Sequence, residues 1–230
     1  MSVGRILVLL LGITGVLVAI GLLFGGGAVL WVDTTLPDRE GFINTRTVKL
    51  QSGAYAVVTE PAEIDLGGVW IFDYKTLATL RIESTNTDPS RGVFLGITTA
   101  SDLDRYLDDV AHDEIVDLSI RPYRVDYQTH PGNSVPTAPN TETFWVASVA
   151  GTGRQTLTWD LAPGSYSLVL MNEDGSAGVD LETRIGAKVP LLRGVGIGLV
   201  TGGAVALLLG SFLIHLAVRR QRLAAKNDRN

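Results

Sequence analysis

Two long uncharged blocks, one near each end of the chain, constrain its fold more than any other feature. The first runs from Ile6 to Val32 and the second from Gly194 to Val218. Each exceeds the ~20 residues that a helix needs to cross the hydrocarbon core of a bilayer. Hydrocarbon offers the backbone no hydrogen-bond partner, so such a run is stable there as a helix that satisfies its own amides. We expect two transmembrane helices that flank a polar middle region.

The charges beside these blocks predict a topology. The last twelve residues, RRQRLAAKNDRN, contain five Arg or Lys and one Asp, and basic flanks stay in the cytoplasm. Two crossings return the N-terminus to the same side, so both termini are expected in the cytoplasm. The alternative is a first block cleaved as a signal peptide after GGGAV, although signal h-regions run to roughly 7 to 15 residues. The expected segments are an N-terminal transmembrane helix (1–32), an extracytoplasmic domain (33–190), a second transmembrane helix (191–218) and a basic cytoplasmic tail (219–230).

The middle region is strongly acidic. It contains 12 Lys or Arg and 23 Asp or Glu, a net charge of −11, against −5 for the whole chain. Nucleic acid binding calls for basic patches that neutralise phosphates, so we expect no nucleic acid partner. The chain has no cysteine, and an exported domain without disulfides must be held by its apolar core. A region of this length can bury enough surface for that.

Short runs of β-branched and aromatic residues, separated by Gly, Pro, Asn and Asp, recur through the middle region. They predict strands at FINTRTVKL, YAVVTE, VWIFDY, TLATLRIEST, GVFLGITT, IVDLSIRPYRVDYQ, TFWVASVA, QTLTWDL, SYSLVLMN and GVDLETRIG. In one of them, Leu80 and Ile82 alternate with Arg81 and Glu83, which are expected to point outward. The fold class expected is an all-β extracytoplasmic domain, an antiparallel β-sandwich with one short amphipathic helix, flanked by the two transmembrane helices. Three tryptophans within the runs are expected in its core: Trp70, Trp145 and Trp159.

The acidic stretch SDLDRYLDDVAHDEIVDL predicts that amphipathic helix. Ser101 and Asp104 have the spacing of a capping box at its start. On a period of 3.6 residues, Leu103, Leu107 and Val110 share one face. We expect about three turns lying over a sheet, with the acidic residues in solvent.

Two acidic groups invite a metal interpretation. Asp108 and His112 are spaced i, i+4 on the expected helix and are candidate metal ligands, but a Zn²⁺ or Mn²⁺ site needs three or four. We favour a solvated helix face, on which Asp108 promotes protonation of a surface His112. In NEDGSAGVD, the candidate calcium ligands Asn172, Asp174 and Asp180 lack the EF-hand spacing, and a hairpin turn explains them better.

Catalytic and cofactor motifs are missing from the sequence. There is no cysteine and no G-x-S-x-G elbow, and nothing selects two of the many carboxylates for hydrolysis. The long loop from Thr129 to Thr143 carries three prolines. His130 within it and Trp145 just beyond it are candidates for a binding rim, although we favour an exposed linker. We therefore expect no cofactor and favour a non-enzymatic role.

Small residues recur every four positions in the second apolar block. This pattern lets helices approach closely, and the first block offers a mate. The ridge is expected to pack within the chain, to self-associate or to bind a foreign membrane subunit. Its residues are Gly194, Gly198, Gly202, Ala206 and Gly210, with Gly21 and Gly25 as the mate.

Three stretches carry a resemblance to a known group of proteins. SYSLVLMNEDGSAGVDLETRIGAKVP runs directly into a Gly-rich membrane helix, and it is accompanied by VFLGITTASDLDRYLDDVAHDEIVDL and FWVASVAGTGRQTLTWDLAPGSY. Together they resemble uncharacterised actinobacterial membrane proteins that have an anchor, a β-rich ectodomain and a second anchor in this order. The resemblance covers the chain from about Gly41 to its end. It implies this layout and a membrane location, and no activity, ligand or catalytic residue.

These observations predict a membrane-anchored protein of the cell envelope that binds or scaffolds through its β-sandwich, with the lipid bilayer as its first partner. One alternative is an accessory subunit of a larger membrane complex, held by the glycine ridge. The other is a metal-dependent hydrolase that uses Asp108 and His112.

Overall fold

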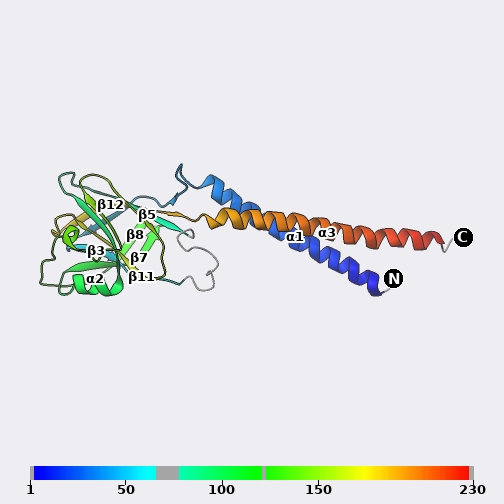
Figure 1. Ribbon diagram of the computed structural model, residues 1–230, viewed down its shortest axis with the longest axis horizontal. Coiled ribbons are helices and arrows are strands. Elements are labelled where there is room, and N and C mark those ends of the chain that lie inside the picture. The colour runs from blue at the N-terminus through cyan, green and yellow to red at the C-terminus, as the bar shows by residue number, and fades with distance from the viewer. Residues whose placement is uncertain (1–2, 66–77, 121–122, 228–230) are drawn as a thin grey trace. The chain divides into compact units, whose positions relative to one another are not determined.

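A computed structural model describes residues 3–65, 78–120 and 123–227 of the chain (Figure 1). It divides into two compact units. One comprises residues 1–37 together with 190–230, and the other runs from Asp38 to Val189. Each unit is described by itself below.

The first unit is a pair of long helices, α1 (Val3–Thr35) and α3 (Leu191–Asn227). Both contain a segment that is long and apolar enough to cross a membrane, Ile6–Thr35 in α1 and Leu191–Arg219 in α3. These segments are compatible with a two-pass membrane protein. The helices lie side by side and run in opposite directions, since Gly12 near the start of α1 meets Gly210 late in α3.

Small residues spaced seven apart form the seam between α1 and α3. A Cβ added at Gly203 would lie 2.9 Å from Leu23 Cγ and 3.2 Å from the carbonyl oxygen of Ala19, so no larger side chain fits at the present separation. A Cβ at Gly210 would similarly lie 2.9 Å from the carbonyl oxygen of Gly12. The buried small residues of the seam are Gly12, Ala19 and Gly26 in α1 and Gly196, Gly203, Gly210 and Ala217 in α3.

The predicted four-residue ridge is wrong as the face that packs α3 against α1, with the exception of Gly210. Added Cβ atoms at Gly194, Gly198 and Gly202 would meet nothing within 4 Å, and the same holds for the expected mates Gly21 and Gly25. The fifth ridge residue, Ala206, is partly buried. Two packed helices keep contact through residues that repeat every seven positions, whereas a four-residue repeat winds away from the partner.

Adjacent glycines in α3 provide a matched test of this seam. Gly203→Leu should push the helices apart by about 2 Å, because helix separation follows the size of the contacting side chains, whereas Gly202→Leu should leave them in place. The measurement is the distance between spin labels at Leu17→Cys and Leu208→Cys, both exposed positions in a chain without native cysteine. Equal distance changes for the two variants would contradict the seam.

The second unit contains two sheets. The first has strands in the order β1-β12-β5-β10, with β2 also paired to β12, and the second has the order β8-β7-β3-β11-β6-β9, with β4 also paired to β11. All described pairs are antiparallel except β3 with β7. The strands of the first sheet are β1 (Ile43–Asn44), β2 (Val48–Ser52), β5 (Thr79–Asn86), β10 (Gln155–Asp160) and β12 (Val179–Lys188). Those of the second are β3 (Ala56–Thr59), β4 (Ala62–Ile64), β6 (Val93–Thr99), β7 (His112–Ile120), β8 (Tyr123–His130), β9 (Ala147–Gly151) and β11 (Gly164–Asn172).

Most predicted strands are found, with local differences. The run FINTRTVKL forms two strands, β1 and β2, and IVDLSIRPYRVDYQ spans parts of both β7 and β8. The short strand β4 was not predicted. The run VWIFDY, with Trp70, lies outside the described residues.

The two sheets share an apolar cluster between them. Alternate residues of each strand enter it, for example Leu95 and Ile97 from β6, Ile82 from β5 and Leu181 from β12. Trp159 packs at its margin, as expected of a core aromatic. This shared core is the arrangement expected of two packed sheets.

A second apolar cluster lies on the other face of the second sheet, under the short helix α2 (Ala100–Tyr106). Leu103, Leu107 and Val110 are all buried, as predicted, but only Leu103 lies in the helix, because α2 has seven residues in place of the expected three turns. Trp145 also packs against this cluster. The predicted cap is wrong: Thr99 is the N-cap, and its hydroxyl accepts from the backbone N–H of Asp102 at 3.3 Å. The capping box therefore starts two residues earlier than expected.

Candidate binding site between the two sheets

An apolar cavity of about 230 Å³ opens between the two sheets. It receives side chains from five strands and from the residue that follows β1. Its lining residues are Thr45, Val48, Leu50, Thr59, Ile115, Leu168, Leu170, Thr183 and Ile185. The cavity is therefore a gap in the shared core, bordered by residues far apart in the sequence.

Unequal sheet widths explain why the gap exists. Across the core, β9 and β6 face β10 and β5, β11 faces β12, and β3 faces β2. Within the described ranges, β7 and β8 extend past the last strand of the first sheet and have no comparable facing strand. Their inward side chains Ile115, Val125 and Tyr127 pack against the edge of the shared core. The cavity lies between β11 and β3 of the wider sheet and β12 and β2 of the narrower one, and Ile115 of β7 borders it on the side where the wider sheet extends further.

The three threonines of the lining present methyl groups rather than free hydroxyls. Thr45 Oγ1 accepts from the backbone N–H of Ile185 at 3.1 Å, and Thr59 Oγ1 accepts from the backbone N–H of Leu168 at 3.0 Å. The hydroxyl of Thr183 lies 2.9 Å from that of Ser84 and bonds with it. These oxygens bond within the chain, and the surface exposed in the cavity is almost entirely carbon, so the cavity wall is apolar.

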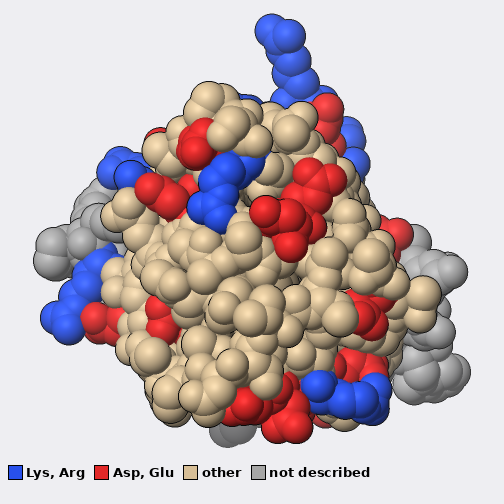
Figure 2. Space-filling view, turned by 90° about the vertical axis from the view of Figure 1, so that its left-hand side faces the viewer, with Lys and Arg blue, Asp and Glu red and all other residues tan. Residues whose placement is uncertain are grey.

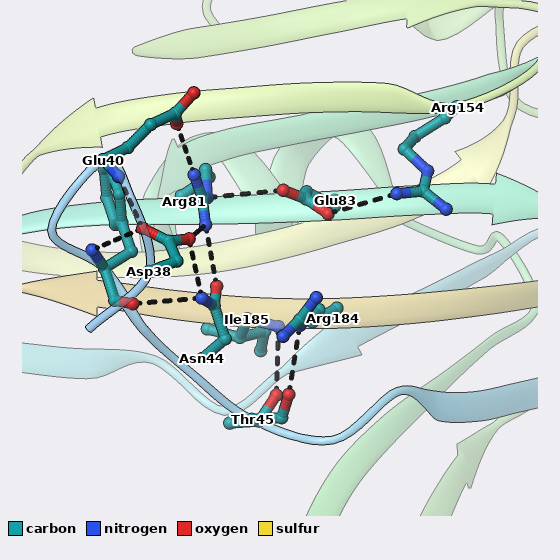
Figure 3. A network of polar contacts seen from close by, with 10 residues as sticks. Asp38, Glu40, Asn44, Thr45, Arg81, Glu83, Arg154, Arg184 and Ile185 are labelled. Carbon is teal, nitrogen blue, oxygen red and sulfur yellow. Dashed lines mark hydrogen bonds and ion pairs between the residues drawn. The ribbon is translucent and has the colours of Figure 1, made fainter. Parts of the chain in front are cut away.

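A charged network holds the segment that leads into the cavity wall (Figure 3). Arg81 in β5 has a side chain that is 8% exposed, and its guanidinium binds Asp38, Glu40 at 2.6 Å and Asn44 Oδ1 at 2.9 Å. Its Nε lies 3.4 Å from Glu83, within ion-pair distance, but makes no hydrogen bond. Three residues of the Asp38–Asn44 segment thus bind the one buried guanidinium. Thr45, which lines the cavity, follows this segment directly.

The loop itself is organised around Asp38. One carboxylate oxygen accepts from the backbone N–H groups of Glu40 and Phe42, both at 3.0 Å, and the other accepts from Asn44 Nδ2 at 2.8 Å. The Phe42 backbone N–H, the Arg81 guanidinium and the Asn44 amide hold the pKa of Asp38 well below its usual range. Phe42 places its ring 4.1 Å from the guanidinium carbon of Arg81, a cation–π contact.

Arg81 is the functional-site residue that the sequence analysis missed. Its neighbours Leu80 and Ile82 point inward as predicted, so Arg81 does lie on the outer face of its sheet. It is nonetheless buried, because residues 38–44 cover it. The available signal was the pair of acids at 38 and 40, placed just after the first apolar block, which could neutralise a strand arginine.

Arg81→Met should lower the free energy of unfolding of the protein by roughly 2 kcal/mol, because the acids lose their cation and Phe42 loses its stacked partner. Arg154→Met is the control. Arg154 lies 3.7 Å from Glu83 on the same sheet, but its side chain is 70% exposed, and its loss should cost less than about 0.5 kcal/mol. Urea unfolding of the full chain in detergent, followed by tryptophan fluorescence, measures both. Equal losses would contradict the anchoring role of Arg81.

The premise of the predicted metal pair is wrong. Helix α2 ends at Tyr106, and Asp109 follows in a left-handed conformation with φ 56°, so His112 begins strand β7 instead of continuing the helix. Asp109 is fixed there by Asn133 and Ser134, whose donors bind its carboxylate at 2.9–3.3 Å. Asp108 and His112 therefore share no helix face. Among the described residues, no group of three or more His, Asp or Glu lies together as metal ligands would.

The predicted loop residues His130 and Trp145 have different neighbours. His130 ends β8, where its ring stacks on that of His112 with centroids 4.6 Å apart, and its Nε2 lies 3.2 Å from Glu114. Trp145 packs on Phe94, and its Nε1 donates to the carbonyl of Pro139 at 2.8 Å. The structure shows no rim that joins the two.

A polar cleft of about 410 Å³ lies among four loops of the domain. It is lined by Ser90, Arg91, Gly92, Ala138, Asn140, Thr152, Glu173 and Asp174. The turn between β11 and β12 borders it, but the predicted hairpin is wrong, because β11 belongs to the second sheet and β12 to the first. Side chains hold this turn: Asp174 accepts from Ser176, and Asn172 donates to the carbonyl of Ser176 at 2.8 Å. Asp180 instead binds Gln51 and Thr87, so the three candidate calcium ligands have separate partners.

Charged side chains are scattered over the face shown in Figure 2. Acidic and basic groups alternate with uncharged surface, and the visible Lys and Arg form no continuous patch. This face offers no basic track of the kind that follows a nucleic acid backbone.

Comparison with models of known protein families gives no match, and comparison with curated proteins gives none either.

Proposed function

We propose that this chain is a membrane-anchored binding protein of the cell envelope, and that its β-sandwich takes an apolar ligand between the two sheets. Both termini lie in the cytoplasm, and the domain from Asp38 to Val189 lies outside the membrane. The apolar inter-sheet cavity is the observation that carries this proposal. Binding sites are typically concave, apolar and largely preformed.

The size of the cavity supports an occupant. Protein interiors are close-packed. The space of about 230 Å³ between the sheets opens to solvent, so it leaves apolar side chains in contact with water. An apolar ligand that covers them would stabilise the domain.

The chemistry of the lining favours binding over catalysis. The nine lining residues are aliphatic or threonine, and none has a titratable side chain. General acid–base or nucleophilic catalysis needs such groups within hydrogen-bond reach of the substrate. This supports a binding protein in preference to a hydrolase.

Binding of N-phenyl-1-naphthylamine, an apolar dye that fluoresces when it leaves water, tests the proposal. Val48→Phe places a ring in the cavity and should weaken dye binding by about tenfold, a loss of ~1.4 kcal/mol. Ile115→Ala enlarges the cavity and should not weaken binding. Val116→Phe is the control, since Val116 is 40% exposed and lies outside the lining. The dye is titrated against the full chain held in amphipol, which avoids competing detergent tails. Dye binding that is equal in Val48→Phe and Val116→Phe would sink the proposal.

An accessory subunit of a larger membrane complex is the second candidate. The face of α3 with Gly194, Gly198 and Gly202 has open space around it, so a foreign helix could approach closely there. If it does, crosslinking in membranes should capture a stoichiometric partner that Gly198→Leu removes. A full chain that crosslinks to nothing, with or without the substitution, would exclude this role.

A further inference from the structure

We propose that the ligand of the inter-sheet cavity is a single unbranched hydrocarbon chain, of the kind carried by fatty acids and membrane lipids. This inference rests on the proposed function and names the ligand class of the same site. Four properties of the cavity carry it: its lining, its size, its shape and its attachment to the membrane helices.

The lining selects against polar ligands. A sugar or peptide brings hydroxyls or amides that must find partners once they leave water, and each unpaired group costs free energy. The cavity surface is almost entirely carbon, and the oxygens of Thr45, Thr59 and Thr183 already bond within the chain, so the lining offers few partners to such groups. A hydrocarbon chain needs no such partners and gains by leaving water.

The size of the cavity suits a chain segment of moderate length. An apolar cavity of about 150 Å³ stays dry and binds benzene, which has six carbons. By the same ratio, about 230 Å³ accommodates about nine carbons. A chain this long fills the cavity, whereas a small gas or solvent molecule leaves most of it empty.

The shape of the cavity favours a chain over a rigid ring system. Packed sheets lie about 10 Å apart, and inward side chains fill most of that separation. Leu168 and Leu170 on one sheet and Leu50 and Ile185 on the other bound the space from two opposite sides, which suits a narrow chain. Val125 and Tyr127 of β8 extend the apolar surface along the edge of the core, where a longer chain can continue.

The attachment of the domain to α1 and α3 indicates where a hydrocarbon ligand would come from. Residues 38 and 189 join the domain directly to two helices that are long and apolar enough to cross a membrane. If these helices span a membrane, the domain is covalently attached to segments that lie among hydrocarbon chains. Nothing charged lines the cavity, so the polar end of the ligand stays outside, and selection acts on the chain.

Photo-crosslinking tests the inference in the full chain. The protein is reconstituted into nanodiscs in one of two ways, either with a phospholipid bearing a diazirine in its acyl chain or with plain lipid and a free diazirine fatty acid. Adducts are mapped by mass spectrometry. We expect labelling of cavity residues such as Ile115, Leu168 and Ile185, reduced about tenfold by Val48→Phe and unchanged by Val116→Phe. Labelling in the first arm identifies a membrane lipid as the source, and labelling only in the second identifies a free fatty acid.

Competition by straight-chain carboxylic acids of increasing length provides the second readout. Each added methylene should strengthen competition about fourfold, up to about nine carbons, after which the gain should level off. A matched series of alkyl maltosides should show the same trend, since the head group stays outside.

Several outcomes would overturn the inference. Labels confined to α1 and α3 in both arms, or competition that is indifferent to chain length, would rule out a hydrocarbon chain. If the naphthylamine dye still binds with the predicted response to Val48→Phe, the binding function stands and only the ligand class fails. If neither dye nor chain binds, both proposals fall together.

Discussion

The burial of apolar side chains between two sheets of unequal width is the constraint from which the rest of the domain follows. One face of each sheet must leave water, and with no cysteine in the chain, this packing holds the sheets together with hydrogen bonds such as those from Asn86 to Asn172 and from Ser52 to Asp113. The wider sheet satisfies part of this need elsewhere, by placing α2 over its second face. At its overhanging edge, β7 and β8 have no closely facing strand within the described ranges. The same packing that stabilises the domain thus leaves an apolar gap at its edge.

Polar interactions fix the position of residues 38–45, which apolar packing alone does not determine. Arg81 holds residues 38–44 against the outer face of the narrower sheet, and Thr45 then enters the cavity wall with its hydroxyl bonded to Ile185. A buried arginine is costly unless its charge is matched, and here three acids and an aromatic ring match it. The position of the cavity wall therefore depends on a network on the opposite face of the same sheet.

The spacing of apolar residues along the sequence predicted the features that belong to a single helix or strand. The apolar face of α2 and most strands followed from spacing alone, because alternation and the 3.6-residue period are properties of a single element. Spacing also placed Arg81 on the outer face of β5. It could not show that residues 38–44 cover that face, since a covering segment comes from elsewhere in the chain.

The features that were mispredicted depend on contacts between two helices or two strands, or on a point where the chain changes direction. The glycine ridge of α3 was assigned a four-residue repeat, but contact with α1 selects the seven-residue line through Gly196, Gly203 and Gly210. The pairing of Asp108 with His112 assumed a third helical turn that Asp109 ends. The cavity depends on which strands face each other across the core, and no short stretch of sequence records that arrangement.

Diffraction from crystals of the full chain pressurised with xenon tests the central claim most directly, because xenon enters dry apolar cavities. The account predicts a xenon atom between Leu168 and Ile185, and ordered water or protein side chains filling that space would contradict it.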